Sequence, residues 1–212
     1  SGIHQVDHSA AHRSTPSELL VTQMQRCAEM VWEVGFSVPR SHWLCHPTPG
    51  SVPPTLIAET LRQAGLAVCV EGLGLGSTVH FVISALTLST GATELMFPRF
   101  GAWEGIAVVS VSDIVYRKGL ASRLEVDYQI GNEVNAHISA QVLSQSDYRA
   151  VRRNAFFLDE VIVESEETLL VNPVVTQKSA EAILGVNEAD PFFFDHPVDH
   201  LPGMLLFHSA AA

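Results

Sequence analysis

The sequence predicts an α+β protein in which one long helix lies across a curled antiparallel sheet. Two observations lead to this fold class. Residues 53–71 carry apolar side chains at helical spacing, and several segments within 79–143 alternate between apolar and polar side chains. Because the strands follow one another instead of alternating with helices, we expect antiparallel neighbours in a single sheet.

Three segments precede the helix. Residues 1–18 are polar and contain several histidines, so we expect a loose lead-in there. Residues 19–36 are mixed in character and are assigned to strand. The stretch 38–54 is broken repeatedly by proline, which is typical of a loop.

The expected helix has a proline-rich start and ends at a glycine. Ser51 is the predicted N-cap, and Pro53 and Pro54 are tolerated in the first turn, where N–H groups have no intrahelical partner. Gly72 is the predicted stop, because glycine adopts a positive φ without strain. One apolar stripe recurs along the helix and consists of Ile57, Leu61, Ala64 and Val68.

A series of strands is predicted after the helix. Gly119 and the pair Gly131–Asn132 supply tight turns between consecutive strands. The predicted strands are Val79–Ser89, Ile106–Tyr116, Leu120–Ile130, Val134–Leu143 and Val161–Ser165.

The composition narrows the classes of function. The chain has 212 residues, of which 47% are hydrophobic and 17% charged, and its formal net charge is −11. With 12 basic against 23 acidic residues, we expect no cationic surface that follows a phosphate backbone, and so no nucleic-acid partner. A small anionic substrate needs only a local cation and stays compatible with this charge.

The cysteines and the lengths of the apolar runs favour a cytoplasmic protein that does not span a membrane. Cys27, Cys45 and Cys69 cannot all pair within one chain, and reduced thiols favour a cytoplasmic protein. No apolar run approaches the roughly 18 residues of a membrane span, so we expect no membrane partner. The first residues also lack the basic and apolar segments of a signal peptide.

Two motifs carry a resemblance to a known family. The segment Asp195–Leu206 looks like a motif of the A-factor biosynthesis hotdog family, and Val38–His42 with Glu59–Ala64 is similar to that family's first repeat. The match runs from about residue 36 onward. The resemblance implies a hotdog fold, in which a curled antiparallel sheet wraps a long central helix. The family is distantly similar to β-hydroxyacyl dehydratases.

The resemblance also implies a domain plan. We expect a polar lead-in over 1–18, a first hotdog repeat over 19–150 and the start of a second, incomplete repeat over 151–212. Where the family carries an acid in its second helix, this chain has His208. An incomplete repeat with an apolar last helix is expected to need a partner, so we predict a homodimer.

The implied reaction is acyl transfer in the biosynthesis of a γ-butyrolactone- or butenolide-type signalling molecule. A β-ketoacyl group passes from an acyl-carrier-protein or coenzyme A thioester to the hydroxyl of dihydroxyacetone phosphate, a small phosphorylated acceptor. No cofactor is expected. Two alternatives stay open: a hotdog thioesterase or dehydratase, and a non-catalytic protein that binds an acyl chain or a partner. The His208 departure favours the non-catalytic alternative.

Three residues on the helix are the catalytic candidates. Glu59, Arg62 and Gln63 lie at i, i+3 and i+4, so they share one side of the helix, which we expect to lie outside the core. Glu59 is expected to act as a base if burial raises its pKa. Arg62 is expected to bind phosphate and Gln63 to orient the substrate. The alternative is an ordinary ion pair on a solvated helix face.

A second loop supplies the expected substrate-binding residues. His196, Asp199 and His200 precede a helix that starts near Gly203, and a helix N-terminus favours anions. The alternative is that Asp199 caps the helix while the histidines face water. No metal is expected: His42–His46 lacks a second ligand pair at zinc-finger spacing, and this loop is expected to line an acyl pocket.

Overall fold

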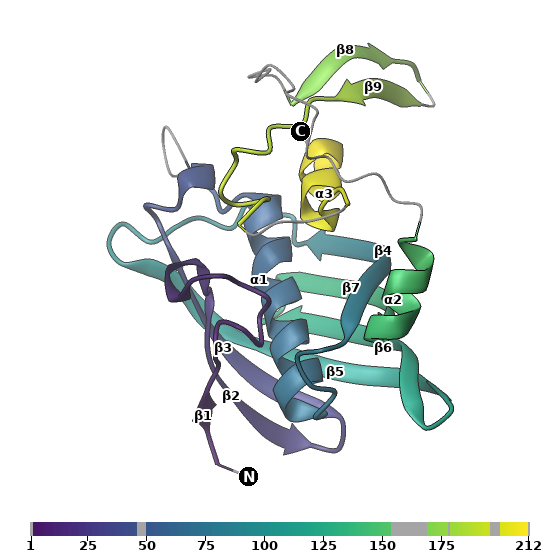
Figure 1. Ribbon diagram of the computed structural model, residues 1–212. Coiled ribbons are helices and arrows are strands. Elements are labelled where there is room, and N and C mark those ends of the chain that lie inside the picture. Colours follow the sequence, from purple (N-terminus) through teal and green to yellow (C-terminus); the bar gives the residue numbers. More distant parts are fainter. Residues whose placement is uncertain (1, 46–49, 154–168, 178, 196–199, 212) are drawn as a thin grey trace. The chain divides into compact units, whose positions relative to one another are not determined.

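A computed structural model describes residues 2–45, 50–153, 169–177, 179–195 and 200–211 of the chain. The chain divides into two compact units, Ser1–Arg153 and Asn154–Ala212. The first unit holds the sheet and the long helix, and the second holds a hairpin and a short helix (Figure 1). No helix among the described residues is long and apolar enough to cross a membrane.

The first unit is built on a seven-stranded sheet in the order β1-β2-β3-β5-β6-β7-β4. Every neighbouring pair in this sheet is antiparallel. The strands are β1 His4–Gln5, β2 Val21–Ala28, β3 Val31–Pro39, β4 His80–Thr90, β5 Ala102–Arg117, β6 Leu120–Ile130 and β7 Val134–Leu143. The α+β class with an antiparallel sheet is therefore confirmed.

Most of the predicted strands agree closely with the structure. β6 and β7 have the predicted bounds, and the turns before them hold Gly119 and Gly131 at positive φ. Residues 19–36 were assigned to one strand, whereas β2 and β3 form a hairpin there. The predicted strand Val161–Ser165 lies outside the described residues. A short helix that the sequence did not indicate, α2 (Gln145–Val151), follows β7 and is capped by Ser144.

The long helix α1 spans Pro54–Ala67 and continues as one turn of π-helix over Val68–Gly72. The prediction that Ser51 caps it is wrong. Pro53 occupies the N-cap with an extended backbone (φ −60°, ψ 139°) and no side-chain cap, while Ser51 forms a bridge with Met96.

Gly72 is the last residue of the helical segment, as predicted, but its backbone conformation is not the expected one. Its φ is not positive. A Cβ at this position would lie 2.8 Å from Nε1 of Trp32 and 2.9 Å from its Cε2. Glycine is therefore required by the close approach of the Trp32 ring, not by a left-handed backbone.

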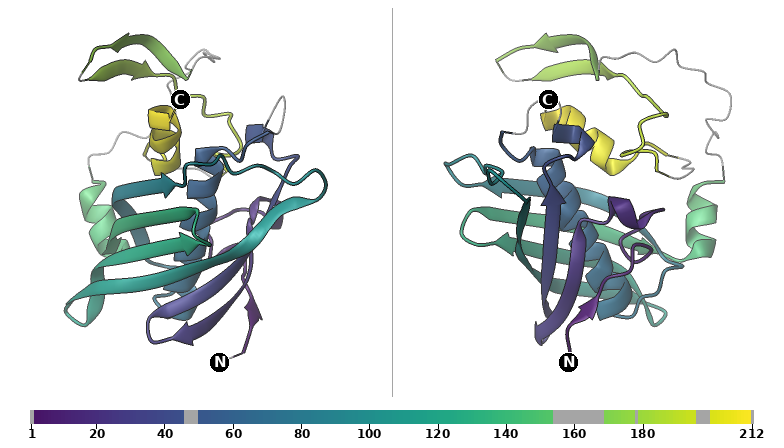
Figure 2. Two further views of the ribbon diagram at one scale, coloured as in Figure 1. Left: turned by 180° about the vertical axis from the view of Figure 1, so that it is seen from behind. Right: turned by 90° about the vertical axis from the view of Figure 1, so that its left-hand side faces the viewer.

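Helix α1 is buried far more completely than one apolar stripe predicts. It lies across the sheet and packs on β2, β3 and β5 (Figures 1 and 2). Within α1 only Pro54 and Arg62 are not buried. The side of the helix that carries Glu59 is thus part of the interior, and the expectation of a solvated or non-core helix face is wrong.

The first eighteen residues are not a loose lead-in. Strand β1 joins the edge of the sheet by pairing with β2. The side chains of Val6, Ala10, Ala11 and Arg13 are buried. A 3-10 helix over Pro16–Glu18 then leads into β2. Because these small apolar residues enter the core, this segment belongs to the first unit.

The described part of the second unit consists of a hairpin and a helix. Strands β8 (Leu170–Val175) and β9 (Ala180–Leu184) form an antiparallel hairpin. Helix α3 spans Gly203–Ala211. The predicted boundary at residue 150 lies near the division between the units, and the assignment of 151–212 to a second hotdog repeat stays a prediction.

Candidate active site on helix α1

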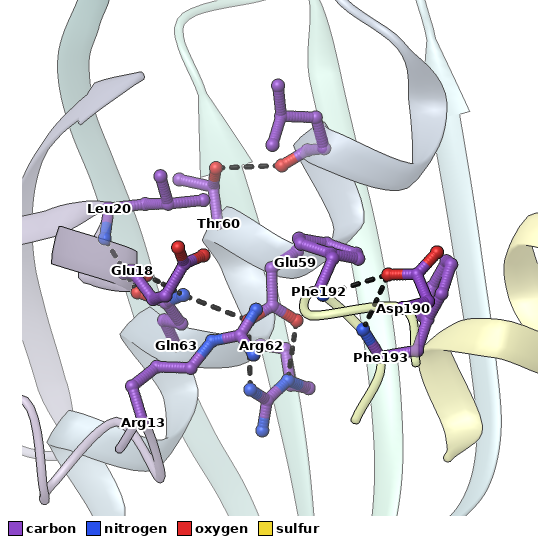
Figure 3. A network of polar contacts seen from close by, with 11 residues as sticks. Arg13, Glu18, Leu20, Glu59, Thr60, Arg62, Gln63, Asp190, Phe192 and Phe193 are labelled. Atoms are coloured by element: carbon purple, nitrogen blue, oxygen red, sulfur yellow. Dashed lines mark hydrogen bonds and ion pairs between the residues drawn. The ribbon is translucent and has the colours of Figure 1, made fainter. Parts of the chain in front are cut away.

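Glu59 lies in the middle of α1 with 1% of its side chain exposed. Its carboxylate is held by three side chains, those of Arg13, Arg62 and Gln63 (Figure 3). A buried carboxylate is stable only when it is paired and hydrogen-bonded. The structure therefore brings the three predicted residues of α1 together and adds a fourth, Arg13.

Arg62 grips the carboxylate with two hydrogen bonds. Its Nε donates to Oε2 of Glu59 at 2.7 Å, and its Nη2 donates to Oε1 at 2.8 Å. The spacing of three residues on one helix makes this geometry possible. The Arg62 side chain is 19% exposed, so it is the member of the cluster most open to solvent.

Arg13 completes the cluster from the N-terminal segment. Its Nη2 lies 3.1 Å from Oε1 of Glu59, and only 4% of its side chain is exposed. A compact turn positions it: the Arg13 N–H donates to the carbonyl of His8, and His12 adopts a left-handed backbone (φ 52°). This contact is not predictable from the sequence, because the two partners are far apart along the chain.

Both the nitrogen and the oxygen of the Gln63 side-chain amide form hydrogen bonds. Nε2 donates to Oε1 of Glu59 at 2.9 Å and to the carbonyl of Glu18 at 3.0 Å, while Oε1 accepts the Leu20 N–H at 2.8 Å. The side chain is fully buried. In this structure Gln63 joins Glu59 to residues 18–20, and its expected role in orienting the substrate stays a prediction.

The electrostatic state of Glu59 differs from the expected one. Burial by itself raises the pKa of Glu59, but the charge and hydrogen bonds of Arg62, the charge of Arg13 and the hydrogen bond from Gln63 together hold it below its ordinary value. The expectation that burial brings this pKa towards neutrality is wrong. Glu59 is a fixed carboxylate near neutral pH.

His42 lies in the loop after β3, and the charges of Arg13 and Glu59 affect its pKa. Burial and the charge of Arg13 lower the pKa of His42, against the opposing charge of Glu59. The Leu44 N–H donates to its Nδ1 at 3.3 Å, which places the proton of the neutral ring on Nε2. A neutral imidazole of this tautomer is a hydrogen-bond donor. His46 lies outside the described residues.

The second predicted loop is only partly described. His196 and Asp199 lie outside the described residues, His200 is exposed, and Gly203 is the first residue of α3. These residues belong to the second unit, so their expected part in substrate binding stays a prediction.

In the second unit, Phe192 and Phe193 make hydrogen-bond and ring contacts. The carboxylate of Asp190 accepts the N–H groups of Phe192 and Phe193 (Figure 3). The ring of His208 lies 5.5 Å from that of Phe193, and burial lowers its pKa; its expected place at the position of a family acid stays a prediction. A neutral His208 cannot replace the charge of an acid.

Within the described ranges, no group of three or more His, Cys, Asp or Glu side chains is arranged to hold a metal ion.

Comparisons with known proteins show which family the chain resembles. The model of the A-factor biosynthesis hotdog domain matches residues 1–156, so the similarity begins well before residue 36, where we had placed its start. A 2-oxo-3-(phosphooxy)propyl 3-oxoalkanoate synthase of Streptomyces virginiae is 30% identical over 97% of this chain and 74% of that protein. A synthase of the same name from Streptomyces griseus is 22% identical over 98% of this chain and 74% of its own length.

A solved structure is similar at a lower level. A thioesterase from Haemophilus influenzae aligns with 61% of this chain and 82% of its own, at 13% sequence identity and a TM-score of 0.41.

Proposed function

The chain belongs to the A-factor biosynthesis hotdog family, and we propose that it joins a β-ketoacyl thioester to dihydroxyacetone phosphate. The name of its relatives' product, a 2-oxo-3-(phosphooxy)propyl 3-oxoalkanoate, describes the ester of these two components. The observation that carries the proposal is the similarity to the Streptomyces virginiae synthase over 97% of this chain. The product would be a precursor of a γ-butyrolactone-class signal.

The proposed reaction balances without a further reagent. The hydroxyl oxygen of dihydroxyacetone phosphate attacks the carbonyl carbon of the thioester, so a C–O bond forms and the C–S bond breaks. The hydroxyl proton is transferred to the departing sulfur, and the free thiol of coenzyme A or of the carrier protein is released. The protein therefore needs to bind a phosphate, orient a hydroxyl and stabilise the oxyanion that develops on the thioester carbonyl.

Arg62 and His42 supply suitable groups for two of these tasks. A guanidinium binds phosphate through paired, charge-assisted hydrogen bonds, and Arg62 is the most exposed member of the Glu59 cluster. The Nε2–H of a neutral His42 suits the developing oxyanion. Glu59, with its lowered pKa, orients Arg62 as a fixed carboxylate. This role replaces that of a near-neutral base.

Finer features of the protein are also proposed here. We place α1 as the central helix of a hotdog fold wrapped by the sheet, which the burial of all but two of its residues supports. We expect a homodimer and a cytoplasmic location. The location is favoured by three free thiols, two of them buried, at Cys45 and Cys69.

The role of Arg62 is tested with two acceptors. Wild-type protein is expected to esterify dihydroxyacetone phosphate far more efficiently than dihydroxyacetone, which lacks the phosphate. In Arg62→Met, kcat/KM for the phosphorylated acceptor should fall by roughly tenfold or more, since a charge-assisted contact is lost. The value for dihydroxyacetone should hardly change. Equal losses for both acceptors would remove phosphate recognition from Arg62.

A further inference from the structure

The two arginines around Glu59 are held in different ways. Arg62 makes two hydrogen bonds to the carboxylate and is 19% exposed, whereas Nη2 of Arg13 lies 3.1 Å from Oε1 and this side chain is 4% exposed. One carboxylate is thus shared by an enclosed guanidinium and a more accessible one. Because Arg62 is more exposed than Arg13, it is the arginine that a ligand from solvent can reach.

Arg13 is fixed by the segment that carries it. The turn over residues 7–13 is closed by consecutive backbone hydrogen bonds, and the neighbouring Ala10 and Ala11 are buried. A charged side chain this deep in the protein requires a partner of opposite charge, because leaving it unpaired is costly. Because the segment that carries Arg13 is fixed and buried, its guanidinium is held beside Glu59 as long as this segment is folded.

The two carboxylate oxygens are supported differently. Oε1 of Glu59 is approached by Arg13, by Gln63 and by Nη2 of Arg62, while Oε2 accepts from Nε of Arg62. Gln63 is itself anchored to the Glu18 carbonyl and the Leu20 N–H, in the same N-terminal segment. If Arg62 turned away, Oε1 would still hold a guanidinium and an amide.

This arrangement lowers the cost of moving Arg62. Removing the sole cation from a buried carboxylate leaves an uncompensated charge, which is strongly unfavourable. Resting on the function proposed above, we propose that Arg13 is the permanent counter-ion of Glu59 and allows Arg62 to exchange this carboxylate for the phosphate of the acceptor. Arg13 is thus a positioning residue that acts on acceptor binding through Arg62.

The test compares a neutral and a charged replacement of Arg13. Arg13→Gln keeps a hydrogen-bond donor and loses the charge, so among the described residues Arg62 is left as the arginine paired with Glu59. The KM for dihydroxyacetone phosphate should rise by roughly tenfold, the amount that one lost charge-assisted contact accounts for. The KM for a β-ketoacyl-coenzyme A should stay within about twofold, because only the acceptor site is affected.

Two further variants control this comparison. Arg13→Lys restores the charge and should return the acceptor KM close to the wild-type value. Arg117→Gln removes an exposed arginine at the end of β5 and should leave both KM values unchanged. Circular dichroism of each variant verifies that the fold is retained.

The outcomes separate this inference from the proposed function. An unchanged acceptor KM in Arg13→Gln, or equal changes for both substrates, would overturn the counter-ion role and leave Arg13 as a support of the fold. Calorimetric binding of dihydroxyacetone phosphate gives a reading that does not depend on turnover. If binding weakens in both Arg13→Gln and Arg62→Met while wild type forms no ester, the inference stands and the proposed reaction fails.

Discussion

At the residue scale, the site is organised by one buried carboxylate. Glu59 and Arg62 were predictable as a pair, because a spacing of three residues on a helix is visible in the sequence. Arg13 was not predictable, since nothing local marks a residue whose partner lies on another element. The direction of the pKa shift of Glu59 was not predictable either, because it depends on the balance between burial, which raises the pKa, and the arginines, which lower it.

Replacing Glu59 should affect both stability and activity. Glu59→Gln keeps the size of the side chain but removes the buried negative charge that faces Arg13 and Arg62, so the free energy of unfolding should fall by about 3–5 kcal/mol. The kcat/KM for dihydroxyacetone phosphate should fall by roughly tenfold, as in Arg62→Met, because Arg62 loses the carboxylate that orients it. Urea denaturation measures the first effect and ester formation the second.

A matched surface variant controls for the loss of a carboxylate. Glu104→Gln affects an exposed side chain that accepts a hydrogen bond from Ser37, and should change the free energy of unfolding by no more than about 0.5 kcal/mol. Equal stability losses in the two variants would argue against a special role for the buried ion pair.

At the element scale, regular alternation decided which strands could be predicted. The bounds of β6 and β7 follow from the period of two and from the glycine turns before them. The hairpin of β2 and β3 was harder to recognise, because register shifts at Val21/Gln23 and Arg26/Ala28 break the period along β2. The complete burial of α1 depends on small residues such as Gly65, which a single apolar stripe does not capture.

The packing of α1 on β6 can be tested at Gly65. A Cβ there would lie 2.0 Å from the hydroxyl of Tyr128 and 3.0 Å from its Cζ. Gly65→Ala should therefore lower the free energy of unfolding by about 1–3 kcal/mol through overpacking. Adding Tyr128→Phe should restore part of this loss, because it removes the closest atom.

The glycine control for this experiment lies in a loop. A Cβ at Gly50 would meet nothing within 4 Å, so Gly50→Ala should be close to neutral in chemical denaturation. A double variant no more stable than Gly65→Ala would show that the hydroxyl is not the source of the clash.

A pH dependence is expected from the network between β6 and β7. His137 lies between Asp127 at 2.8 Å and Glu125 at 3.0 Å, and the hydrogen bond to Asp127 is the main cause that raises the pKa of His137. A raised folded pKa stabilises the protein below the unfolded value of about 6.5. This contribution is lost as the pH rises through the folded pKa. Thermal midpoints of wild type and His137→Gln should therefore converge towards alkaline pH, and a constant difference would contradict the assignment.

At the scale of the whole molecule, the chain consists of two units, and the family match covers the first one. The family match covers residues 1–156 and so coincides closely with the first unit, Ser1–Arg153. The second unit carries the motif that first indicated the family, but part of that motif lies outside the described residues. Its assignment to a second repeat rests on the resemblance alone and stays a prediction.

The predicted homodimer belongs to this scale. Leu201 is 41% exposed and Leu206 50% exposed, although burial of such side chains is worth roughly 1.5–3 kcal/mol each. A second copy that covers them would recover this energy. Sedimentation equilibrium at micromolar concentration should give a dimer mass, and Leu206→Glu should shift it towards the monomer. A stable wild-type monomer would contradict the prediction.

The central claim is acyl transfer to dihydroxyacetone phosphate, and product analysis tests it most directly. Purified protein is incubated with a β-ketoacyl-coenzyme A and dihydroxyacetone phosphate, and the released thiol and the ester are quantified together by mass spectrometry. Transfer predicts one ester for each thiol released, and no thiol release when the acceptor is omitted. Release of thiol with free β-keto acid and no ester would contradict the claim and identify a thioesterase instead.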